Sequence, residues 1–146
     1  MANALNYISL AKKARLIELG EEPVGAAARA GQARLIVVAS DASDHTWRRA
    51  RSFAAGTEQQ CIRVPFTKDE LGLAVGRTAL AIGAFTDPAM ALAFVKALGD
   101  QEKYREVLEA LDVKSRKLRQ RQTEAKAHQR NLRMGKRRQE PGTKKT

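Results

Sequence analysis

The chain has 146 residues, the length of a single domain, and its 43% of hydrophobic residues is enough for one modest core. Its formal net charge of +11 and isoelectric point near 10.3 are unlike those of a typical soluble enzyme and indicate a polyanionic partner. A single cysteine excludes an intramolecular disulfide, and no apolar stretch approaches the roughly 18 residues of a membrane span. The first residues lack the basic and apolar regions of a signal peptide, so we expect a cytoplasmic protein.

The positive charge is concentrated toward the C-terminus. Residues 1–98 hold 12 Lys/Arg and 9 Asp/Glu, a net of +3. From Lys114 onward, 13 basic residues are accompanied only by Glu124 and Glu140, a net of +11. The basic character therefore belongs to the C-terminal segment, where a polyanion would bind.

A helix and a short strand are predicted at the start of the chain. Leu5, Ile8 and Ala11 recur at helical spacing, and residues 16–19 follow as a strand. A second helix begins after Gly20, because acidic residues and a proline are favoured in a first helical turn.

A buried strand is predicted after that helix, which ends at Gly31. Residues 35–39 are five consecutive apolar residues, typical of a strand covered on both faces. Residues 40–44 supply hydroxyls and carboxylates that can cap the next helix, whose inner side includes Trp47 and Ala50.

The second half of the domain repeats the alternation. A strand over 62–65 is followed by a capping box, in which Thr67 and Glu70 bond each other's backbone amides at a helix start. Another strand covers 79–85, and Asp87 then caps a helix that has proline in its first turn. Strands alternating with helices of about ten residues predict an α/β sandwich with a largely parallel or mixed sheet.

We expect a domain over residues 1–99 and a basic extension over 100–146. Apolar side chains at helical spacing predict a helix over about 101–112 that docks on the domain. Residues 114–121 are good helix formers with little apolar surface, so the tail beyond is expected to be helical or disordered. Leu111 and Leu118 begin a seven-residue repeat, but its companion positions are polar, which predicts a weak coiled coil at best.

The sequence offers no set of catalytic or metal-binding residues. Two histidines, His45 and His128, and one cysteine cannot form a tetrahedral zinc site by themselves. Cys61 lies in a predicted strand, which favours a buried structural thiol over a reactive one. Gly72 and Gly76 lack the spacing of a phosphate-binding loop, so close helix packing explains them better. We expect no catalytic activity, no metal and no cofactor.

Four segments in order along the domain resemble the L-seven-Ae ribosomal protein superfamily, especially its small bacterial members. These segments are LAKKAR (10–15), LGEE (19–22), LIVVASDAS (35–43) and LGLAVG (71–76). The resemblance covers about residues 4–98. It implies a three-layer α-β-α sandwich with a mixed, largely parallel sheet that binds kink-turns or related internal loops in RNA.

In that family the start of the second helix enters the RNA through a G-x-N-E-x-x-K pattern. Here Gly20 keeps the glycine, whereas Glu22, Pro23 and Ala26 occupy the other positions. A carboxylate accepts hydrogen bonds from guanine or cytosine amino groups but repels phosphate. We therefore expect an RNA surface with altered specificity, the alternative being a retained fold whose site is lost or directed to a protein.

Together these observations predict a ribosomal or ribosome-associated protein that binds structured RNA, with ribosomal RNA as the expected partner. The domain would read RNA structure through Gly20, Glu21, Glu22, Asp41 and Arg77. Phosphate contacts would come from cations near the first helix end and in the tail: Lys12, Lys13, Arg15, Lys114, Arg116, Lys117, Arg119 and Arg121. The alternative is a protein-interaction module whose tail binds polyanions without specificity.

Overall fold

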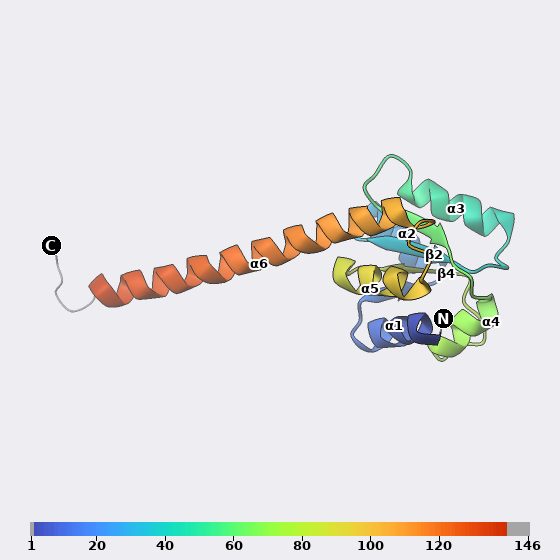
Figure 1. Cartoon of the computed structure of the whole chain (residues 1–146), viewed down its shortest axis with the longest axis horizontal. Helices are drawn as coiled ribbons and strands as arrows, with labels where there is room; N and C mark the ends of the chain where they lie inside the picture. The colour runs from blue at the N-terminus through green and yellow to red at the C-terminus, as the bar shows by residue number, and fades with distance from the viewer. Residues whose placement is uncertain (1, 140–146) are drawn as a thin grey trace.

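The computed structural model describes the backbone of residues 2–139 and the side chains of residues 4–132. Helices and strands alternate up to the last strand, after which two helices follow (Figure 1). In chain order the elements are α1 (Ala2–Lys13), β1 (Ile17–Leu19), α2 (Glu21–Arg29), β2 (Leu35–Val38), α3 (Asp44–Ala54), β3 (Gln60–Arg63), α4 (Lys68–Ala74), β4 (Ile82–Phe85), α5 (Pro88–Leu98) and α6 (Arg105–Gln139).

The strands form one mixed sheet in the order β1-β4-β2-β3. β2 and β3 are parallel, whereas β4 runs antiparallel to both β1 and β2. The predicted sandwich with a mixed sheet is confirmed, but the expectation that the sheet is largely parallel is wrong. The reason is α4, which is only 7 residues long. The chain then returns to the start of this helix, where the Leu80 amide donates to the Lys68 carbonyl at 2.9 Å, so β4 begins at the end of the sheet where β3 stops.

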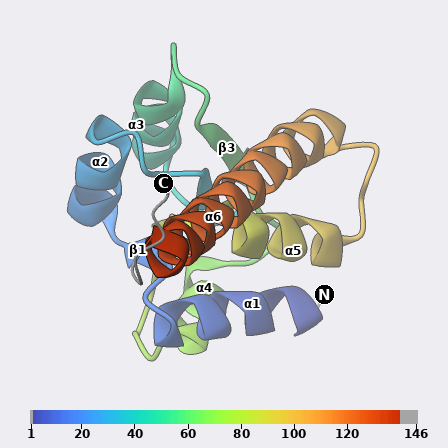
Figure 2. The same cartoon turned by 90° about the vertical axis from the view of Figure 1, so that its left-hand side faces the viewer.

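Helices cover both faces of the sheet (Figure 2). α2 and α3 pack together on one face, and α1, α4 and α5 lie on the other. Phe85 of β4 and Phe94 of α5 are fully buried between sheet and helices, with ring centroids 5.1 Å apart. All residues of β2 are buried, as its unbroken apolar run predicted, because helices cover both of its faces.

Local capping signals in the sequence set the helix starts. Thr67 and Glu70 form the predicted capping box of α4, and the Asp87 carboxylate accepts from the Met90 amide at 2.8 Å at the start of α5. Gly72 confirms the expectation of close packing, because a Cβ there would lie 2.7 Å from the backbone of Ala79. A side chain at this position would therefore force α4 away from the loop that follows it.

The C-terminal helix begins on the domain. α6 starts at Arg105 and continues unbroken to Gln139, so the helix expected over about 101–112 begins later and extends much further. Its first turns dock on α5, as predicted, and bury Leu111 and Ser115 to 1% and 4% exposure. Tyr104, just before the helix, is part of the same core. Docking therefore depends on a few side chains of one helical face.

The rest of α6 projects away from the domain (Figure 1). Every residue from 119 to 132 is exposed. Residues with high helix propensity fill this segment, and Gln120 donates to the Glu124 carboxylate four residues on at 3.1 Å. The helix thus continues where no core supports it. None of the helices within residues 2–139 has the length and apolar character needed to cross a membrane.

Candidate nucleic-acid interface

The strand directions place the loops at two ends of the sheet. β1, β2 and β3 run in one direction; we call the end where they stop the carboxyl end and the end where they start the amino end. Residues 20–22, 40–43 and 76–81 border the carboxyl end, whereas Arg34 and residues 86–88 border the amino end. α4 lies at the carboxyl end, and α6 leaves the domain past the amino end (Figure 1). The predicted RNA-binding residues are therefore divided between two separate places.

Gly20 and Arg77 come together at the carboxyl end. Gly20 precedes α2 with φ 98° and ψ 160°, a conformation that is essentially restricted to glycine. A Cβ on Gly20 would lie 3.8 Å from an η nitrogen of Arg77, which follows α4. Two residues 57 positions apart in sequence thus border one surface, with the exposed Arg77 guanidinium beside the start of α2.

The two glutamates of α2 have different environments. The Glu21 carboxylate pairs with the Arg49 guanidinium of α3 at 3.0 Å, which joins the two helices on this face of the sheet. Glu22 is exposed. Negative charge in the first turn of a helix interacts favourably with the positive end of the helix dipole, so both glutamates stabilise the start of α2. Only Glu22 is left with a carboxylate that faces solvent without an ion pair among the described side chains.

Asp41 is used within the protein. Its carboxylate accepts a hydrogen bond at 2.8 Å from the backbone amide of Lys68, the first residue of α4. The loop after β2 is thereby fastened to the start of α4, which also carries the Thr67 capping box. Asp41, one of the residues expected to read RNA structure, lies at the carboxyl end, but one of its oxygens is committed to a structural contact.

The cations at the end of α1 also differ from one another. The Lys12 ammonium donates to the Val75 carbonyl at 2.7 Å and so caps the end of α4. Lys13 is exposed in the last turn of α1. Arg15 follows with φ 60°, a left-handed conformation that favours glycine, and its amide bonds the Lys12 carbonyl at 3.1 Å. All three cations are exposed, and Lys12 in addition joins α1 to α4.

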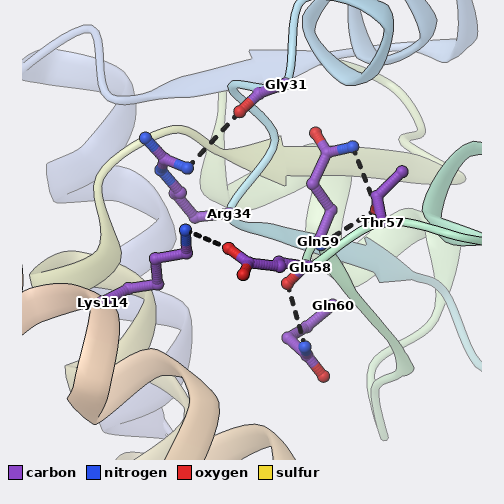
Figure 3. A network of polar contacts seen from close by, with 7 residues as sticks. All are labelled: Gly31, Arg34, Thr57, Glu58, Gln59, Gln60 and Lys114. Atoms are coloured by element: carbon purple, nitrogen blue, oxygen red, sulfur yellow. Dashed lines mark hydrogen bonds and ion pairs between the residues drawn. The ribbon is translucent and has the colours of Figure 1, made fainter.

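The predicted tail cations lie along the docked and first projecting turns of α6. Lys114 forms an ion pair with Glu58 from the loop before β3 (Figure 3). Arg116 pairs with Asp112 one turn earlier at 2.9 Å. The remaining three predicted cations are Lys117, Arg119 and Arg121, and all are exposed.

Two residues at the amino end were missed by the sequence prediction. Arg34, just before β2, lies beside Lys114, and its guanidinium donates to the Gly31 carbonyl at 3.4 Å (Figure 3). Glu58 has a pKa below its ordinary value of 4.5, because the Lys114 ammonium donates a hydrogen bond to it and attracts its charge. Neither residue belongs to a motif, and their approach to α6 depends entirely on the docking of that helix.

Cys61 is only partly buried in β3, whereas its sequence context favoured a buried thiol. Desolvation raises the pKa of its thiol to about 12, which favours the protonated form at neutral pH. Among the described residues, no three His, Cys, Asp or Glu side chains lie close enough together to hold a metal ion.

Comparison with known proteins gives a fold but no family. No protein family matches the chain, and no curated protein matches it either. A protein of unknown function from Bacillus halodurans has 25% identity and a TM-score of 0.63, over 68% of this chain and 99% of that one. The Giardia lamblia 15.5kD RNA binding protein has 17% identity and a TM-score of 0.55, over 73% of this chain and 85% of that one. The chain is therefore similar in fold to an RNA-binding protein.

Proposed function

We propose that this protein is a non-catalytic, cytoplasmic RNA-binding protein, ribosomal or ribosome-associated, that binds structured RNA. The observation that carries the proposal is the projecting part of α6. Between residues 119 and 132 it exposes four cations, Arg119, Arg121, Lys126 and Arg130, and one carboxylate, Glu124. A helix with this composition and no core to cover is suited to lie along a polyphosphate backbone.

The electrostatic reason is the release of counterions. Like charges held along one helix repel each other, and the domain does not neutralise the cations of the projecting part. Each phosphate that they neutralise releases condensed cations from the RNA, which favours binding and makes it depend on salt. At 1.5 Å per residue, the 14 exposed residues span about 21 Å, enough to follow several successive phosphates.

The domain is assigned to the recognition of RNA structure because of its fold and its sequence resemblance. Its fold is similar to that of the Giardia RNA-binding protein, and its sequence resembles the L-seven-Ae superfamily. Gly20, Glu22 and Arg77 border the start of α2, where the resemblance places RNA contacts. Glu22 favours contacts with amino groups of bases over contacts with phosphates, so the specificity is expected to differ from that for standard kink-turns.

The proposal is tested by removing charge from the projecting helix only. In the triple variant Arg119→Gln, Lys126→Gln, Arg130→Gln, the affinity for a fluorescein-labelled RNA hairpin should fall. The slope of log affinity against log salt should flatten by about 2 to 3, because each lost phosphate contact removes roughly 0.7 to 0.9. Fluorescence anisotropy at several salt concentrations measures both quantities.

The matched control removes three exposed cations from the domain: Arg48→Gln, Arg51→Gln, Lys96→Gln. This control should keep nearly the wild-type slope, although both triple variants lose the same net charge. Equal slopes in the two variants would contradict the role given to α6. Sedimentation with ribosomes before and after nuclease treatment tests the ribosomal part, since a protein-interaction module would keep its partners after the RNA is digested.

A further inference from the structure

A small cavity at the amino end is lined by cations from two distant parts of the chain. Its volume is about 50 Å³, and it lies between the start of β2, the start of α5 and the part of α6, residues 114–121, where the helix leaves the domain. No carboxylate lines it. Four of its six lining residues are basic: Arg34, Lys114, Lys117 and Arg121, with Pro88 and Leu118 completing the wall.

The fold brings these cations together for identifiable reasons. Arg34 is held at the sheet because its amide donates to the Phe85 carbonyl of β4 at 2.8 Å. α5 starts just after β4, and α6 packs along α5. Positions three and seven residues apart share one helical face, so Lys114, Lys117 and Arg121 all turn toward the cavity.

The positive charge in this cavity is only partly compensated. The Glu58 carboxylate pairs with Lys114, which leaves three cations without an ion pair in the described part of the chain. Asp87 is close by in sequence to Pro88, but its carboxylate is engaged by the Met90 amide. The Arg34 guanidinium carries five N–H donors and uses one of them on the Gly31 carbonyl, so it can also donate to an anion.

We propose that this cavity binds one phosphate group of the RNA backbone, held jointly by Arg34 of the domain and the inner face of α6. The inference deepens the proposed function and rests on it, because it joins three of the predicted tail cations, Lys114, Lys117 and Arg121, with Arg34 in one defined phosphate contact. It also places a phosphate contact at the amino end of the sheet, away from Gly20 and Arg77. RNA bound along α6 would reach the domain at this cavity first.

A double-mutant cycle distinguishes a shared phosphate from a diffuse field. Arg34→Gln and Arg121→Gln should each weaken binding of the labelled RNA hairpin by roughly tenfold. The double variant should lose much less than the product of the two factors, because the shared phosphate is already released by either change. The matched control pairs Arg34→Gln with Arg130→Gln, which lies further along α6 and does not line the cavity, and here the two factors should multiply.

The outcomes separate this inference from the proposed function. The shared site would be overturned if the affinity losses of Arg34→Gln and Arg121→Gln multiply in the double variant, or if Arg34→Gln has no effect on affinity. Salt-dependent RNA binding by α6 would stand in either case. Wild-type protein that does not bind the hairpin at all would overturn both. Thermal unfolding of each variant checks that the losses do not come from destabilisation.

A second arm distinguishes backbone phosphate from a free anion. Inorganic phosphate is titrated into the wild-type protein while the backbone amide signals of residues 34, 117 and 121 are followed by NMR. Weak binding that disappears in Arg34→Gln is the expected result. Inorganic phosphate that binds as tightly as the RNA hairpin would identify a small-anion site and overturn the assignment to RNA.

Discussion

The two ends of the sheet use their charged residues in different ways. At the carboxyl end two of the carboxylates have partners within the protein: Glu21 pairs with Arg49, and Asp41 caps α4. At the amino end, Arg34 and the inner cations of α6 gather around a cavity with a single compensating carboxylate, that of Glu58. Charged groups that are satisfied within a fold stabilise it, whereas charged groups left without partners are available to a ligand.

The largest effect is expected when α6 no longer docks on the domain, because the difference between the two ends of the sheet depends on that docking. Leu111→Ala removes a side chain that is 1% exposed, and it should lower the free energy of unfolding by about 2 to 5 kcal/mol. Affinity for the RNA hairpin should fall as well, because Arg34 and Arg121 no longer meet. Urea unfolding and anisotropy measure the two effects. Val113→Ala is the control, since Val113 is 41% exposed and little is lost there; equal losses from both substitutions would show that α6 is not docked as described.

A smaller effect is expected at the carboxyl end. Gly20→Ala places a side chain at φ 98° and ψ 160°, which should lower the free energy of unfolding by about 1 to 3 kcal/mol. Hairpin affinity should fall while the salt slope stays unchanged, because no cation is removed. Gly31→Ala is the matched control, since Gly31 has φ 72° and open space around its Cβ position, and should cost less. A larger cost at Gly31 would contradict the strain assigned to Gly20.

The smallest effect is a gain of affinity at the amino end. Glu58→Gln removes the carboxylate beside the cavity and frees Lys114, so RNA binding at low salt should tighten about two- to threefold. Glu18→Gln, which removes an exposed carboxylate from β1, should leave affinity unchanged. A gain of affinity cannot be caused by unfolding of the variant, so this test is insensitive to destabilisation. An unchanged Kd in Glu58→Gln would argue directly against phosphate binding at this end.

The difference in RNA affinity between wild type and Glu58→Gln should depend on pH. The pKa of Glu58 is lowered in the folded protein, so its ion pair contributes stability above about pH 4.5 and loses it as pH falls through the lowered value. Below that value the wild-type Glu58 is neutral. Wild type and Glu58→Gln should therefore converge in RNA affinity in acid and differ near neutral pH.

Much of the fold follows from local sequence signals. The capping box at Thr67, the cap and proline at Asp87 and Pro88, and the apolar run of β2 each act within a few residues, so the sequence alone placed these elements. The order and direction of the strands were less accessible, because they depend on whether a connecting helix crosses the sheet. α4 does not cross it, and the sheet is mostly antiparallel for that reason.

The candidate site also has a part that the sequence predicts and a part that only the tertiary structure reveals. Composition alone established that the tail is basic, because charge needs no partner to be counted. Only the tertiary structure joined Arg34 to Lys117 and Arg121, and Gly20 to Arg77, because these pairs are distant in sequence and meet through packing of helices on the sheet. The sequence thus determined where the positive charge lies along the chain, and the docking of α6 decided which of these cations meet Arg34 on the domain.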